Sequence, residues 1–386
     1  MGFGTLAVVS VVALLGPLLA YRRRWNLPVV LGELAAGALI GVSGFHLVDP
    51  DDSTFAFLAD IGFALVMFVA GTHVPMRDTA IRPALRRGAA RAVAVGVAAV
   101  PVGIALAAVF GTGKAGLYSV LVASSSAALV LPIVDSLRLA GRPVVETVAQ
   151  VAIADTVCIV ALPLVIDPGR AARAAVGAVV VAAGAALVYL AFRWFVRTGL
   201  QDRSHRISEE RGFALELRVN LALLFGLAAL ATWTHVSIML AGFGLGLALS
   251  AVGEPRRLAR QLFGLTEGFL GPLFFVWLGA SLDLRALALH PSYIGLGLAL
   301  GLSALVVHGL ARLLGQPMPL AALAAAQLGI PVAAATIGTQ LGLFEEGEAP
   351  ALLLGALVTI GIAAVAGGLA VRRGLVETRD HPARPR

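Results

Sequence analysis

Long apolar runs separated by short polar segments dominate the chain. The runs are roughly 16 to 26 residues long, and none alternates with the period of two that is typical of a barrel strand. A helix of about 20 apolar residues crosses the hydrocarbon core of a bilayer. We therefore predict an all-α polytopic membrane protein with about 13 transmembrane helices. The predicted spans are 4–21, 28–43, 54–73, 88–111, 115–134, 143–166, 171–196, 215–233, 235–252, 264–282, 291–314, 317–341 and 349–371.

The composition supports a membrane protein. Hydrophobic residues make up 59% of the 386 positions and charged residues only 13%, about half the charge of an ordinary water-soluble domain. The lone cysteine, Cys158, excludes an internal disulfide and a cysteine-based metal site. No basic patch with a fold of its own is present, so nucleic acid is not an expected partner. The expected partner is the lipid bilayer.

The basic residues predict the orientation. With the spans above, 25 of the 29 lysines and arginines fall on one side of the membrane. Basic residues gather in cytoplasmic loops. We therefore expect a multi-pass protein of the plasma membrane, with the N-terminus outside and the C-terminus in the cytoplasm.

Two similar segments indicate an internal repeat. "FVAGTHVPMR" (68–77) ends the third span and "VWLGASLDLR" (276–285) ends the tenth, each with an arginine six residues after its glycine. The offset of seven spans gives the copies opposite orientations, as in the inverted repeats of many secondary transporters. We predict one membrane transport domain, 1–386, divided into a first repeat (1–166), a connector helix and cytoplasmic loop (167–214), a second repeat (215–371) and a cytoplasmic tail (372–386).

Asp155 is the most informative single residue. It lies at the middle of the span 143–166, where a lone carboxylate costs about 3 kcal/mol even on a lenient insertion scale. Carboxylates at this depth generally mark ion or proton pathways, although a neutral Asp155 that is hydrogen-bonded to backbone is the alternative.

Two helix breaks are predicted at the same depth. Three consecutive hydroxyls, Ser124, Ser125 and Ser126, compete for backbone groups in the fifth span. Gly329 and Pro331, shortly after Gln327, weaken the helix of the twelfth span. Two broken helices that cross at the midplane would expose carbonyls and half-helix ends suited to a proton or small cation. A simple proline kink with small-residue packing is the alternative.

Three further carboxylates are possible accessories. Glu33 and Glu267 lie toward the inner ends of their spans, where snorkelling would also explain them, and Asp60 lies in the outer half of the third span. His308 would relay protons or, as a neutral side chain, pack between helices.

These residues favour secondary active exchange of a monovalent cation for protons. The alternatives are a membrane sensor or partner subunit that does not transport, and a carrier of another small solute. No nucleophile–base pair, metal cluster or phosphate loop is present, so we expect neither an enzyme nor a cofactor, and no metal beyond the transported cation.

The motifs, in their order, resemble the bacterial monovalent cation–proton antiporter-2 family, with its Kef-type and sodium–proton members. The resemblance is carried by "LGELAAGALIGVSGF" (31–45), "ASSSAALVLPIV" (123–134), "AIADTVCIVALPLV" (152–165) and "FFVWLGASLDL" (274–284). It implies a core bundle that slides against a dimerisation panel, and hence a homodimer. It also implies that Asp155 is the shared proton and cation site, helped by Ser125 or Ser126. Members usually carry Asp, Asn or Gln before this aspartate, whereas this chain has Ala154. The short tail leads us to expect no nucleotide regulation within the chain.

Overall fold

The computed structural model describes residues 1–21, 29–72, 82–199, 213–234, 236–253 and 260–376. In these ranges the chain is helical, and the only β-type pairing is an isolated bridge between Leu139 and Val376. Eleven described helical segments are long and apolar enough to cross a membrane, and two shorter apolar helices accompany them. The prediction of about 13 spans in an all-α membrane protein is confirmed. Residues 200–212 of the predicted connector and loop (167–214), and residues 377–386 of the predicted tail (372–386), lie outside the described residues.

The first half of the chain contains α1 to α9. Their bounds are α1 (Phe3–Ala13), α2 (Leu15–Ala20), α3 (Val29–Ile40), α4 (Ser53–Thr72), α5 (Arg82–Phe110), α6 (Ala115–Ala123), α7 (Ala127–Ser136), α8 (Arg142–Ile166) and α9 (Ala171–Arg197), with a short 3-10 turn, η2 (Pro168–Arg170), before α9.

The second half begins with α11. Its elements are α11 (Leu215–Trp233), α12 (Ile238–Val252), α14 (Arg260–Leu265), a π-helical stretch η3 (Thr266–Leu270), α15 (Gly271–Ala280), α16 (Leu284–Leu289), α17 (Pro291–Gly309), a 3-10 turn η4 (Leu310–Leu314), α18 (Met318–Ala324), α19 (Gly329–Gln340) and α20 (Glu348–Arg372).

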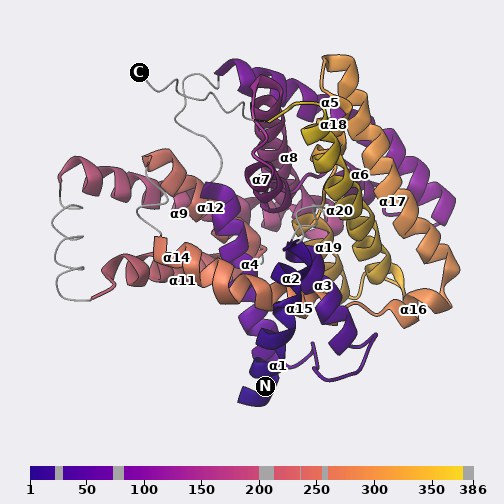
Figure 1. Ribbon diagram of the computed structural model, residues 1–386, viewed down its shortest axis with the longest axis horizontal. Coiled ribbons are helices and arrows are strands. Elements are labelled where there is room, and N and C mark those ends of the chain that lie inside the picture. Colours follow the sequence, from indigo (N-terminus) through magenta and orange to yellow (C-terminus); the bar gives the residue numbers. More distant parts are fainter. Residues whose placement is uncertain (22–28, 73–81, 200–212, 235, 254–259, 377–386) are drawn as a thin grey trace, which may run out of the picture.

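The helices form two groups, which we call the core and the panel. In the core, α5, α6, α7 and α8 pack with α17, α18, α19 and α20; in the panel, α1 to α4 pack with α9, α11, α12 and α15. Figure 1 shows the core to the right of α4 and the α9–α11 arm to the left. The two groups meet where α8 contacts α9 and α12, and where α7 contacts α4. Asp155 lies on α8, so the candidate ion residue belongs to a helix at this boundary.

Glycines bring the panel helices into close contact. A Cβ on Gly71 of α4 would lie 3.1 Å from the Cα of Gly246 on α12, and one on Gly37 of α3 would lie 2.9 Å from the Cα of Gly279 on α15. Small residues allow such backbone approach between membrane helices. The second span thus pairs with the tenth, and the third with the ninth. An inverted repeat offset by seven spans would produce this pairing, which agrees with the predicted repeat without establishing it.

Replacing one of these glycines should destabilise the panel. A Cβ on Gly246 would lie 2.1 Å from the carbonyl oxygen of Phe68, so Gly246→Leu must push α4 and α12 apart. Overpacking of this kind costs about 1–3 kcal/mol or more. We expect a lower apparent melting temperature for the purified variant. Gly226→Leu is the matched control, because nothing lies within 4 Å of a Cβ at that position. Equal melting temperatures for the two variants would contradict the prediction.

Candidate functional site

Both predicted helix interruptions are present and lie in contact. The first separates α6 from α7 at Ser124–Ser126, and the second separates α18 from α19 at residues 325–328. The Ser125 hydroxyl donates to the Ala324 carbonyl oxygen at 2.7 Å, and the Gln327 amide Nε2 donates to the Leu121 carbonyl oxygen at 2.6 Å. Each break therefore donates a side-chain hydrogen bond to a carbonyl oxygen beside the other break, and these two bonds hold the breaks together in the core.

A threonine on α20 fixes the second break. The backbone N–H of Gln327 donates to the Thr359 hydroxyl oxygen at 3.0 Å, and that hydroxyl donates to the Ala356 carbonyl oxygen at 2.7 Å. Thr359 is fully buried. Sequence reasoning missed this residue, although it is the only polar side chain in the run 351–365, and that isolation was the available signal.

The second break lies slightly before the predicted position. Gly329 and Pro331 were expected at the interruption itself, but α19 begins at Gly329, which places Pro331 in its first turn. A proline is tolerated in the first turn because the N–H that it lacks would have no partner within the helix. The residues without helical structure are instead 325–328, which include Gln327.

The Asp155 carboxylate reaches the first break. It is 2% exposed, and its Oδ2 accepts the backbone N–H of Ala127, the first residue of α7, at 2.9 Å. The N-terminus of a helix carries partial positive charge and unpaired N–H groups, so it stabilises an anion there. A buried carboxylate in this position can remain ionised, and can also exchange that ionised state for a protonated or cation-bound one.

The three serines differ in what they bind. Ser124 donates to the Leu121 carbonyl oxygen at 2.8 Å, whereas Ser125 holds the second break. Ser126 is also buried, but its hydroxyl has no hydrogen-bond partner among the described residues. Since a buried hydroxyl without a partner is costly, Ser126 is the serine with an oxygen available to a bound ion.

This difference predicts different phenotypes. Ser126→Ala breaks no protein hydrogen bond, so it should keep the melting temperature and raise the cation concentration needed for half-maximal exchange, about three- to tenfold for one lost ligand of about 1 kcal/mol. Ser125→Ala breaks the contact with Ala324 and should lower both stability and turnover. Titration of cation-dependent proton movement, beside melting curves of the two variants, checks the contrast. Unchanged cation dependence in Ser126→Ala would exclude its hydroxyl from the site.

His308 belongs to the framework of the breaks. Its Nδ1 lies 2.9 Å from the Ala304 carbonyl oxygen, and its Nε2 lies 3.3 Å from the Ser125 hydroxyl oxygen. A carbonyl only accepts, so Nδ1 carries a proton. The Ser125 hydroxyl has one hydrogen, and because it is donated to the Ala324 carbonyl oxygen it is not also donated to Nε2. His308 is fully buried and packs α17 against the first break.

The three possible accessory carboxylates do not lie beside Asp155 at the helix breaks. Glu33 is buried in the panel, where its side chain packs against Gly16 of α2. Glu267 is exposed on the π-helical stretch η3. Asp60 lines a cavity of about 380 Å³ between panel and core, together with Asp167 and with Pro163 of α8. We call this cavity the outer vestibule, because it lies on the side predicted to face outward. Among the described residues, no group of three or more His, Cys, Asp or Glu side chains has the spacing of a metal site.

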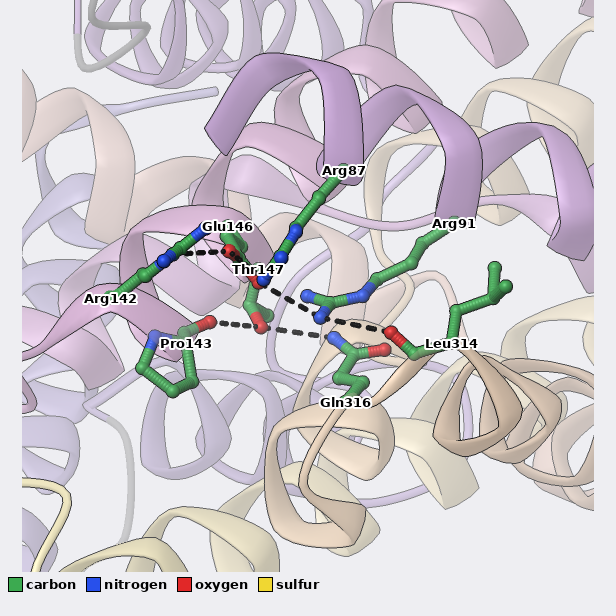
Figure 2. Close-up of polar contacts among 8 residues, drawn as sticks. All are labelled: Arg87, Arg91, Arg142, Pro143, Glu146, Thr147, Leu314 and Gln316. Carbon is green, nitrogen blue, oxygen red and sulfur yellow. Dashed lines mark hydrogen bonds and ion pairs between the residues drawn. The ribbon is translucent and has the colours of Figure 1, made fainter. Parts of the chain in front are cut away.

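A charged cluster closes the opposite end of the core. Figure 2 shows Arg87, Arg91 and Arg142 around Glu146 of α8. The shortest ion pair joins Arg91 Nη2 to Glu146 Oε2 at 2.9 Å, and both side chains are buried. Beside it, Gln316 Nε2 donates to the Thr147 hydroxyl oxygen at 2.9 Å. The cluster connects α5 and α8 to the segment before α18, and sequence reasoning gave it no role.

The chain shares its fold with a solved sodium proton antiporter. The chain superposes on the sodium proton antiporter MjNhaP1 from Methanocaldococcus jannaschii with a TM-score of 0.70 over 100% of both chains, at 17% sequence identity. A structure of that protein at pH 8 gives a TM-score of 0.68, with 95% of this chain and 98% of that one covered, at 18% identity. At this identity the likeness shows the fold alone.

Curated relatives are more similar in sequence. YjbQ of Bacillus subtilis is 26% identical over 92% of this chain, which spans 61% of that protein. The glutathione-regulated potassium-efflux system protein KefC of Enterobacter is 29% identical over 70% of this chain and 44% of its own length. The Na(+)/H(+) antiporter NhaS5 of Synechocystis is 29% identical over 68% of this chain and 38% of its own length. The chain thus spans about two-fifths to three-fifths of the length of these relatives.

The family comparison covers nearly the whole chain. Residues 10–372 match the family described as sodium/hydrogen exchanger, transmembrane. The resemblance to cation–proton antiporters drawn from the motifs is confirmed. The chain belongs to the transmembrane sodium/hydrogen exchanger family.

Proposed function

We propose that this protein exchanges a monovalent cation, sodium or potassium, for protons, with Asp155 as the binding site that the two share. The observation that carries the proposal is the buried Asp155 carboxylate on the N-terminal N–H of α7, where two broken helices meet. Family membership and the names of the relatives agree with cation–proton exchange.

The chemistry follows from competition for one carboxylate. When Asp155 is protonated, the site is neutral and holds no cation. When it is ionised, the Ala127 N–H and the N-terminus of α7 stabilise the charge, and a cation can bind to the carboxylate and to nearby oxygens. Ser126 offers such an oxygen, as do carbonyls at the broken ends. Proton and cation therefore exclude one another, which couples their movements.

Alternating access requires movement at the boundary between core and panel. Asp155 is carried by α8, and the outer vestibule lies between α8 and the panel helices. A shift of the core against the panel would open Asp155 to the vestibule in one state and to the cytoplasm in the other. We infer from the family fold that two copies associate through their panels, in the plasma membrane.

The activity is testable in membrane vesicles. Everted vesicles that contain the protein are acidified by respiration, and a pH-sensitive dye reports proton release when sodium or potassium chloride is added. We expect sodium, potassium or both to dissipate the gradient, and choline chloride to have no effect. Vesicles that respond to neither cation would contradict the proposal and favour a membrane protein that does not transport.

A single site carboxylate predicts exchange without net charge movement. Ala154 supplies no second carboxylate, and Glu33 and Glu267 do not lie at the breaks. One carboxylate holds either one proton or one monovalent cation. A membrane potential acts only on net charge moved, at about 2.3 kcal/mol per charge per 100 mV. We therefore expect sodium–proton exchange in proteoliposomes to keep its rate when a potential is set with valinomycin and potassium. A rate that changes with the sign of the potential would point to a second titrating group, and Asp60 would be tested next.

A further inference from the structure

A long groove lies at the boundary between core and panel, separate from the breaks and from the outer vestibule. Its volume is about 800 Å³, and its walls come from α8, α9 and α12. Most of the lining is apolar, with Val160 from α8, Val181 from α9 and Phe243 from α12. Val160 and the groove-lining alanines Ala182 and Ala186 are exposed, so the groove opens to the surroundings of the protein.

The apolar part of the groove has about the length of the hydrocarbon half of one membrane leaflet. Along α9 the groove extends from Val181 to Arg197, sixteen residues that span about 24 Å at 1.5 Å per residue, and the stretch from Val181 to Arg193 accounts for about 18 Å of this length. Half of a hydrocarbon core of about 30 Å is about 15 Å. An extended acyl chain in this groove would therefore begin at mid-membrane and end near the two arginines.

The end of the groove on the predicted cytoplasmic side is basic. Arg193 and Arg197 both line it, one turn apart on α9, on the side predicted to be cytoplasmic. Arg193 Nη1 donates to the Tyr189 hydroxyl oxygen at 2.9 Å, and its guanidinium lies 5.9 Å from the centre of the Tyr189 ring. Within the described part of the chain, neither arginine has a carboxylate at ion-pair distance. Their charges are available to a phosphate at headgroup depth.

We propose that the groove binds an anionic phospholipid of the cytoplasmic leaflet, with one acyl chain between α8, α9 and α12 and the phosphate on Arg193 and Arg197. Charge complementarity selects this occupant, because the cytoplasmic leaflet is anionic and basic residues near its surface each contribute about 1 kcal/mol to binding. Apolar walls on three helices exclude a soluble anion as the main ligand.

The lipid site lies beside α8, the helix that carries Asp155. Thr156 lines the groove and is the neighbour of Asp155 on α8. Any movement of α8 against α9 and α12 would change the walls of the groove and displace the chain within it. The bound lipid is therefore part of the surface on which the core would move.

Native mass spectrometry of the purified protein tests the site. The delipidated protein is titrated with phosphatidylglycerol or phosphatidylcholine that carry the same acyl chains. Two arginines at about 1 kcal/mol each predict that phosphatidylglycerol binds about 30-fold more tightly. Equal retention of the two lipids by the wild-type protein would overturn the proposal without any variant being needed.

Variants locate the site. Arg193→Gln combined with Arg197→Gln should remove the preference for phosphatidylglycerol. Arg218→Gln, which removes an exposed arginine of α11 outside the groove, should keep the preference and serves as the control for loss of a surface arginine elsewhere. Ala186→Trp fills the groove while leaving both arginines, and should weaken retention of both lipids. A preference that survives the double variant, or retention unchanged by Ala186→Trp, would place the lipid elsewhere.

Discussion

Replacement of Asp155 by asparagine should abolish cation–proton exchange while leaving the protein folded. The carboxylate is buried and accepts one backbone N–H at Ala127, and an asparagine side-chain oxygen can accept the same hydrogen bond. Asparagine cannot ionise, so it can neither release a proton nor balance a bound cation. We expect the dye response to added sodium and potassium to fall to that of vesicles without the protein, at a near-normal melting temperature.

Two neutral substitutions are the matched controls. Glu33→Gln removes a buried carboxylate from the panel, and Asp60→Asn removes one from the outer vestibule. Neither side chain lies at the breaks, so both variants should retain exchange of the wild-type order. Exchange that persists in Asp155→Asn would remove this residue from the mechanism. Loss of exchange in Glu33→Gln at unchanged stability would show that a second carboxylate is essential.

Membrane burial explains why the spans were predictable from the sequence. In a helical membrane protein most backbone polar groups in the hydrocarbon region are satisfied within their own helix, so each crossing appears in the sequence as a long apolar run. The short second span followed the same rule and is α3, Val29–Ile40. The pairing of α3 with α15 was less visible, because Gly37 and Gly279 are far apart in the sequence and only their small size signals a close approach.

The candidate site was predictable in its residue types but not in its contacts. Asp155 and the serines were visible because polar groups at the midplane are expensive. The hydrogen bond from Gln327 to Leu121 and the one from Ser125 to Ala324 each join segments about 200 residues apart. No local pattern encodes such a partner. Pro331 illustrates the same limit, since a proline marks a helix boundary but does not say whether the helix ends there or begins.

The second large effect is expected at the charged cluster of Figure 2, through stability rather than transport. Glu146 accepts from Arg91 at 2.9 Å, from Arg142 at 3.0 Å and from Arg87 at 3.1 Å. Arg91 is 2% exposed, whereas Arg87 and Arg142 are 58% and 64% exposed. Glu146→Gln would leave the Arg91 guanidinium buried without a counter-charge, and breaking a buried pair in this way costs about 3–5 kcal/mol.

The exposed arginines supply the matched control for this cluster. Arg142→Gln removes one partner of Glu146 that faces solvent, and such pairs contribute about 0–1 kcal/mol. The apparent melting temperature should therefore fall much further in Glu146→Gln than in Arg142→Gln. Arg91→Leu combined with Glu146→Leu should recover most of the loss, because it removes the uncompensated charge together with the pair. If Glu146→Gln and Arg142→Gln have the same apparent melting temperature, the buried pair adds little stability. If the double variant is the least stable of all, the two residues act through packing rather than through their opposite charges.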